Sequence, residues 1–62
     1  MSMTFREDIA TLEARIAKAE SERDGWRVAG MQEKYLEAYS MVEALELQLE
    51  LLQRAVRLGA KP

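Results

Sequence analysis

The chain has no cysteine and no histidine, and Pro62 is its only proline. Without cysteine it forms no disulfide, and without either residue type it lacks the usual ligands of a structural zinc site. Disulfides and zinc stabilise many very small domains, and a chain of 62 residues buries only about 60% of its unfolded surface. We therefore expect oligomerisation to supply the part of the core that this chain lacks.

Long apolar runs and an excess of positive charge are also missing. No stretch approaches the roughly 18 consecutive apolar residues of a membrane helix. Glu7 and Asp8 stand where a secretory signal peptide would have its apolar segment, so we expect a cytoplasmic location. Nine Lys and Arg residues against eleven Asp and Glu leave a net charge of −2, which disfavours nucleic acid as a partner.

Few residues here suit catalysis. Nucleophilic catalysis needs a base beside the nucleophile, and the chain has neither histidine nor cysteine to form such a pair. The three glycines are too isolated to form a phosphate-binding loop. Glu43, Glu46 and Glu50 share a helix face and are the one candidate group for acid–base chemistry or metal binding. A solvated helix face is the simpler interpretation of that spacing. We predict no catalytic, cofactor or metal site and interpret the chain as a non-enzyme.

The residues that are present form a strong helical pattern, with apolar side chains at alternating spacings of four and three. The first stripe comprises Phe5, Ile9, Leu12, Ile16, Ala19 and, beyond Arg23, Trp26. The second comprises Met31, Tyr35, Ala38, Val42, Leu45, Leu49, Leu52 and Val56. The second stripe is displaced by two residues, or roughly 200° around a helix, so one continuous helix would put the stripes on opposite sides.

We therefore predict an all-α fold, an antiparallel hairpin of two long helices at about 5–28 and about 31–58, in one domain spanning 1–62. Thr4 and Glu7 form a capping box before the first stripe, and Gly59 is a plausible stop after the second.

The position of the turn has two candidates. Gly30 can adopt the left-handed conformation that ends a helix, whereas Asp24 and Gly25 form an alternative turn. Trp26 continues the first stripe and favours Gly30, while Val28 fits the second stripe and favours Gly25. We favour Gly30 and leave Gly25 open.

The second helix is expected to be apolar on both sides. Ala44, Leu47, Leu51 and Leu58 fall nearly opposite the second stripe, and Tyr39 and Met41 widen the apolar surface. One partner helix covers only one face, so a second partner is needed. A homodimer forming a four-helix bundle or coiled coil would cover the other face, and a different protein is the alternative. The pattern leaves a parallel and an antiparallel dimer equally open.

Candidate partner-binding residues combine aromatic and aliphatic side chains with negative charge. Tyr39 is the strongest candidate, because interface hot spots are rich in aromatics and Leu36 and Glu43 lie beside it. Residues 35 to 53 carry four glutamates and no base, which suits a basic protein surface and neither nucleic acid nor a membrane surface. The full candidate set is Trp26, Leu36, Tyr39, Met41, Glu43, Leu47, Leu51 and Leu58.

Four sequence segments between residues 12 and 49 carry a resemblance to known proteins: LEARIAKAE (12–20), RDGWR (23–27), AGMQEKYLEAY (29–39) and VEALELQL (42–49). They resemble small accessory proteins of temperate pseudomonad phages, a group that includes helical anti-activators of quorum sensing. The resemblance implies a dimeric inhibitor that binds a host transcription regulator, such as a Lux-type quorum-sensing activator, in the host cytoplasm. It carries over no catalytic or ligand motif. The alternative function is a structural coiled-coil subunit of a larger assembly.

Overall fold

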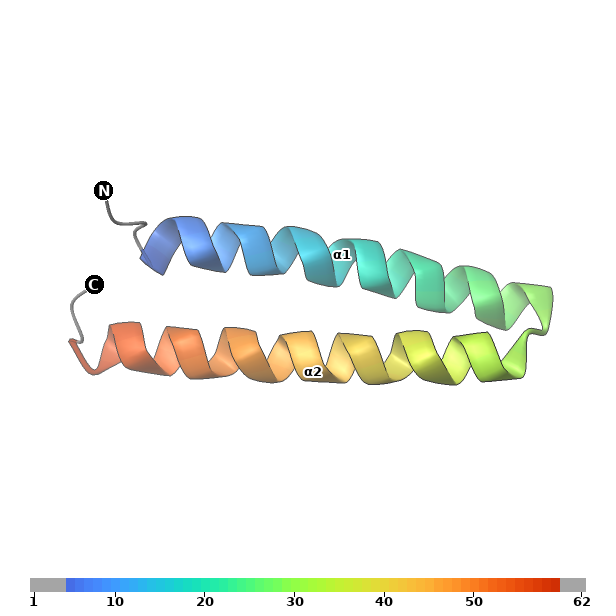
Figure 1. The fold of residues 1–62 in the computed structure, drawn as a ribbon. Helices are drawn as coiled ribbons and strands as arrows, with labels where there is room; N and C mark the ends of the chain where they lie inside the picture. Colours follow the sequence, from blue (N-terminus) through green and yellow to red (C-terminus); the bar gives the residue numbers. More distant parts are fainter. Residues whose placement is uncertain (1–4, 60–62) are drawn as a thin grey trace.

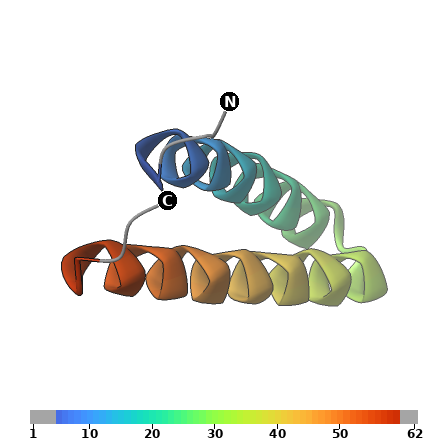
Figure 2. The same ribbon diagram turned by 60° about the vertical axis from the view of Figure 1, so that its left-hand side comes forward.

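The computed structural model describes residues 5–59, and their side chains from residue 6 onward. It consists of α1 (Phe5–Ala29) and α2 (Gln32–Arg57), which lie side by side and run in opposite directions (Figure 1). The start of α1 and the end of α2 lie at the same end of an elongated hairpin of 44 × 19 × 14 Å (Figures 1 and 2). The predicted all-α antiparallel hairpin is confirmed.

A narrow core lies between the two helices at the middle of both predicted stripes. Its buried members are Ile16, Ala19, Val42 and Leu45, and the half-buried Leu12 and Leu49 pack against them. Side chains three and four residues apart share one helix face, so each helix presents one continuous line to the other. The side chains of this line are less buried toward the ends of α2, where Met31 and Val56 are 45% and 40% exposed.

The turn between the helices lies at Gly30, whose φ of 74° is in the left-handed region that favours glycine. The N–H of Gly30 donates to the carbonyl oxygen of Arg27 at 3.1 Å, and the N–H of Met31 donates to that of Trp26 at 3.0 Å. This pair of hydrogen bonds is a Schellman motif, which satisfies carbonyl groups that the end of α1 would otherwise leave unpaired. Gly25, the alternative turn residue, lies inside α1.

Gly59 follows the end of α2 with a φ of 80°. There the N–H of Leu58 donates to the carbonyl oxygen of Arg54, and the N–H of Gly59 donates to that of Val56, both at 3.0 Å. The end of α2 is therefore also closed by a glycine in the left-handed region. Thr4, the predicted partner of Glu7 in a capping box, lies outside the described residues.

Candidate interaction surface

Exposed apolar side chains are distributed unequally between the two helices. Between residues 6 and 59, the large hydrophobic side chains that stay exposed on α1 are Trp26 and Val28, both near its end. Those on α2 and its C-cap are Leu36, Tyr39, Met41, Leu47, Leu51, Val56 and Leu58. The outward side of α1 is therefore mostly polar, while the outward side of α2 is rich in aliphatic groups.

One line of residues on α2 points directly away from α1. It runs through Ser40, Ala44, Leu47, Leu51, Arg54 and Leu58, all exposed, and we call it the α2 outer face. Leu47, Leu51 and Leu58 are 56%, 52% and 80% exposed. The alternating spacing of four and three matches that of the buried line on the opposite side of the helix, so the outer face has the periodicity of a second helix-packing seam.

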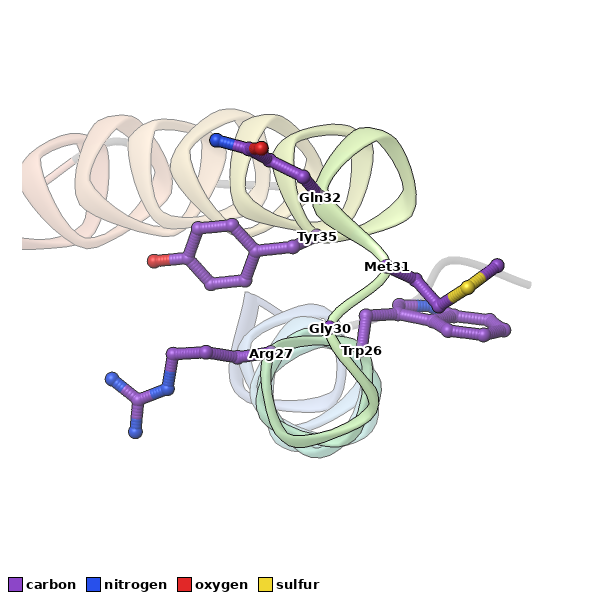
Figure 3. Close-up of a pocket in the computed structure, with 6 residues that line it drawn as sticks. All are labelled: Trp26, Arg27, Gly30, Met31, Gln32 and Tyr35. Carbon is purple, nitrogen blue, oxygen red and sulfur yellow. The ribbon is translucent and has the colours of Figure 1, made fainter.

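The turn forms a second feature, in which side chains of both helices meet. A shallow depression of about 310 Å³ is lined by Trp26, Arg27, Gly30, Met31, Gln32 and Tyr35 (Figure 3). Trp26 and Met31 lie together on one side of the turn, whereas Arg27 and Tyr35 extend toward the other side (Figure 3). The ammonium of Lys34 lies 5.7 Å from the Trp26 ring centroid, within range of a cation–π interaction.

Three predicted partner-binding residues lie on one flank of α2. Leu36 and Tyr39 are 54% and 45% exposed, and Glu43, also exposed, follows one turn later. The ring of Tyr39 packs on that of Tyr35, with centroids 6.0 Å apart and planes tilted by 50°. We call Leu36, Tyr39 and Glu43 the Tyr39 flank.

Met41 lies apart from this group, although the sequence pattern indicated that Met41 and Tyr39 both widen the apolar surface of the second helix. Residues two positions apart are separated by roughly 200° around a helix, so the two side chains leave α2 on opposite flanks. Met41 lines a depression of about 220 Å³ together with Arg15, Lys18 and other residues beside the core. Trp26 is likewise separate from the Tyr39 flank and belongs to the turn.

Charges are segregated along α2. Glu43, Glu46 and Glu50 line an open depression of about 480 Å³ with Ala44 and Leu47, whereas Arg54 and Arg57 occupy the last turn. In the described part of the chain, no group of three His, Cys, Asp or Glu residues is arranged to hold a metal ion. Glu43, Glu46 and Glu50 place negative charge beside the apolar side chains of Ala44 and Leu47.

Arg23 and Arg54 each form an ion pair on the surface of the described part of the chain. Arg23 Nε donates to Asp24 Oδ1 at 3.0 Å, and Arg54 Nη2 lies 3.5 Å from Glu50 Oε2. The hydrogen bond to Asp24 raises the pKa of Arg23, whose guanidinium is in any case charged at every physiological pH.

The cation–π contact of Lys34 was not foreseen in the sequence. Trp26 and Lys34 belong to different helices, and only the tight turn at Gly30 brings them together. The one sequence signal for this contact is the position of Trp26 shortly before the turn and of Lys34 shortly after the turn.

No family model, curated protein or solved structure matches this chain. Neither α1 nor α2 has the length and apolar content required to cross a membrane. The surfaces that the described residues leave exposed for an interaction are the α2 outer face, the Tyr39 flank and the turn.

Proposed function

We propose that this chain is a small non-enzymatic interaction module that acts, as a homodimer, as a phage-encoded inhibitor of a host regulatory protein. A Lux-type quorum-sensing transcription activator is the partner class that the resemblance over residues 12–49 supports. The single observation that carries an interaction role is the exposure of an aromatic and aliphatic surface on α2, with Tyr39 at 45% and Leu36 at 54%. A cytoplasmic site of action follows from this partner.

The Tyr39 flank has the features of a binding hot spot. Tyrosine combines a large apolar ring with a hydroxyl group, and it is enriched among residues that dominate binding energy. Contact with the ring of Tyr35 already restricts Tyr39 in the free protein. Less side-chain entropy is then lost on binding, which favours affinity.

The charges beside the flank indicate the kind of partner surface. Glu43 borders Tyr39, and Glu46 and Glu50 extend the negative field along α2. A complementary surface is an apolar groove with basic residues at its rim, because opposite charges speed association and disfavour wrong partners.

Binding between purified proteins tests this proposal. The probe is a purified Lux-type activator of a pseudomonad host, titrated against the immobilised full chain and its Tyr39→Ala variant. We expect the variant to bind at least about tenfold more weakly, because hot-spot truncations typically cost 2 kcal/mol or more. Glu13→Ala on the exposed side of α1 is the matched control and should bind as the wild type does.

Circular dichroism of each variant establishes that the helices are retained. If the wild-type chain binds neither this activator nor any other transcription regulator in a host lysate, the inhibitor proposal is wrong. If Tyr39→Ala binds as tightly as the wild type, the Tyr39 flank is not the binding surface.

A second candidate function is a structural coiled-coil subunit, which the exposed leucines of the α2 outer face favour. Such a subunit would continue from chain to chain into larger assemblies, whereas an inhibitor of the kind proposed forms a closed dimer. Light scattering on the purified chain distinguishes the two, since a mass that grows with concentration favours the subunit.

A further inference from the structure

The hairpin has a small core for a domain that must fold in water. Of the described side chains only Ile16, Ala19, Val42 and Leu45 are buried, and one of them is an alanine. Leu47 and Leu51, close to the middle of α2, are more than half exposed. Small chains without disulfides or metals commonly complete their core by association, and an exposed line of leucines is a typical association surface.

The α2 outer face is the surface on which such association can occur. The outward side of α1 offers no matching line, since its exposed large hydrophobic residues, Trp26 and Val28, lie near the turn. A second copy of this chain would therefore pack α2 against α2, and each α1 would lie on the outside. This places the two α2 helices in the middle of a four-helix assembly.

Two copies of the α2 outer face have complementary side-chain sizes when the two helices run antiparallel. Its first half carries the small residues Ser40 and Ala44, and its second half carries the long residues Arg54 and Leu58. An antiparallel pair centred between Leu47 and Leu51 places small groups opposite long ones. The facing pairs are Leu47 with Leu51, Ala44 with Arg54, and Ser40 with Leu58. In a parallel pair the small side chains of one copy would instead face the small side chains of the other at one end, and the long side chains would face each other at the other end.

Charge favours the same orientation. The ion pair between Glu50 and Arg54, 3.5 Å apart, places these residues on one flank of the outer face, and Glu43 lies on that flank as well. In an antiparallel pair equivalent flanks meet, so Glu43 of one chain faces Arg54 and Arg57 of the other. Glu50 lies opposite its own copy near the centre of the pair, where its ion pair with Arg54 of the same chain offsets part of the repulsion. In a parallel pair Glu43 would instead face the opposite flank, which carries Glu37 and no base between residues 35 and 53.

We infer that two copies of this hairpin form an antiparallel homodimer through the α2 outer face, with Leu47 of each chain packed against Leu51 of the other. This inference gives an architecture to the homodimer of the proposed function and is independent of the host partner. It places the two turns at opposite ends of the dimer. Leu36 and Tyr39 of each chain, which lie nearer the turns than the leucine pairs, then remain free to bind two partner molecules, while Glu43 belongs to the dimer contact.

Disulfide trapping tests the orientation, because the chain has no cysteine of its own. The variants are Ser40→Cys and Leu58→Cys, each in the full chain, with an affinity tag on one of them so that mixed and self-linked dimers separate on a non-reducing gel. In the antiparallel dimer the two copies of residue 40 lie about 27 Å apart along the helix, too far for a disulfide. We expect the mixture to cross-link and each variant alone to stay unlinked.

Ser21→Cys, at an exposed position of α1, is the matched control. Mixed with Leu58→Cys it should give no cross-linked product. Light scattering gives the mass without cross-linking, and we expect the wild type to be a dimer at micromolar concentration. Leu51→Arg should be monomeric at the same concentration.

Self-linking of Ser40→Cys alone would establish a parallel pair and overturn the inference. A wild type that is helical and monomeric would overturn it as well. If the activator still binds, a parallel pair leaves the proposed function standing, whereas a monomer removes the homodimer from it and keeps the inhibitor role. A dimer without activator binding would refute only the inhibitor role. A Leu51→Arg variant that remains a dimer would show that another surface holds the copies together.

Discussion

Met31 donates its backbone N–H to the carbonyl oxygen of Trp26 at 3.0 Å, and its side chain lies alongside the Trp26 indole (Figure 3). The carbonyl oxygen of Met31 accepts the N–H of Tyr35 at 2.8 Å, so the same residue begins α2. Met31 thus completes the end of α1 and the start of α2 at once. This dual role leaves only Gly30 and Met31 between the two helices.

Replacing Gly30 by alanine should destabilise the hairpin, by about 1–2 kcal/mol, because a Cβ atom disfavours the left-handed conformation. A Cβ atom built at Gly30 meets no atom within 4 Å, so the effect comes from the backbone alone. Gly25→Ala is the matched control. Gly25 lies inside α1 with equally open space around it, so this substitution should stabilise by about 0.5–1 kcal/mol.

Urea unfolding monitored by circular dichroism measures both changes. We expect the free energy of unfolding to fall in Gly30→Ala and to rise in Gly25→Ala. A Gly30→Ala variant as stable as the wild type would place the turn elsewhere.

Leu45→Ala should lower the free energy of unfolding by about 2–5 kcal/mol, because it empties part of a small core. Leu45 is 8% exposed and packs with Val42, Ile16 and Ala19. Leu36→Ala makes the same chemical change at a position that is 54% exposed, and its effect should stay within about 0.5 kcal/mol. Thermal unfolding at fixed protein concentration compares the two variants. Equal destabilisation would contradict the assignment of the core.

Arg23→Leu should stabilise the hairpin, since it replaces the one polar side chain in the first stripe by an apolar one. The Arg23 side chain is 26% exposed and pairs with Asp24, an exposed contact that contributes little. Arg15→Leu, at an exposed position of α1, serves as the control and should leave stability nearly unchanged. Denaturant unfolding distinguishes the variants. A loss of stability in Arg23→Leu would show that the Asp24 pair outweighs the apolar contact.

Met31→Ala should expose the Trp26 indole and shift its fluorescence emission to longer wavelength. Trp26 is 36% exposed and is the sole tryptophan, so the signal is specific to the turn. Met41→Ala is the control, because Met41 lies beside Arg15 and Lys18 and away from the turn. An unchanged spectrum in Met31→Ala would show that Met31 does not cover the indole.

Much of the fold follows from the spacing of apolar residues in the sequence. The displacement of the second stripe from the first by two residues requires a break, and the residues buried between the helices, Ile16, Ala19, Val42 and Leu45, are all members of the two stripes. Spacing is informative here because a helix converts it directly into a face, with little influence from the rest of the chain.

The choice between Gly25 and Gly30 needed the tertiary structure, because local signals supported both. Turning at Gly30 keeps Trp26 in α1, where its carbonyl oxygen and ring both meet Met31. Contacts across a turn depend on both helices together, so no single stripe reveals them. The same reason explains why the approach of Lys34 to Trp26 was missed.

The candidate interaction surface also depends partly on the sequence alone and partly on the tertiary structure. By itself the sequence determined that Leu47, Leu51 and Leu58 share a face opposite the second stripe, because the helical period requires it. Only the tertiary structure decided which face stays uncovered: α1 packs on Val42 and Leu45 and leaves the three leucines exposed. The helical period places Met41 and Tyr39 on opposite flanks of α2, and the packing of α1 then puts Met41 beside Arg15 and Lys18. A helix with two apolar faces carries no internal preference for either one, and the packing of its partner helix makes the choice.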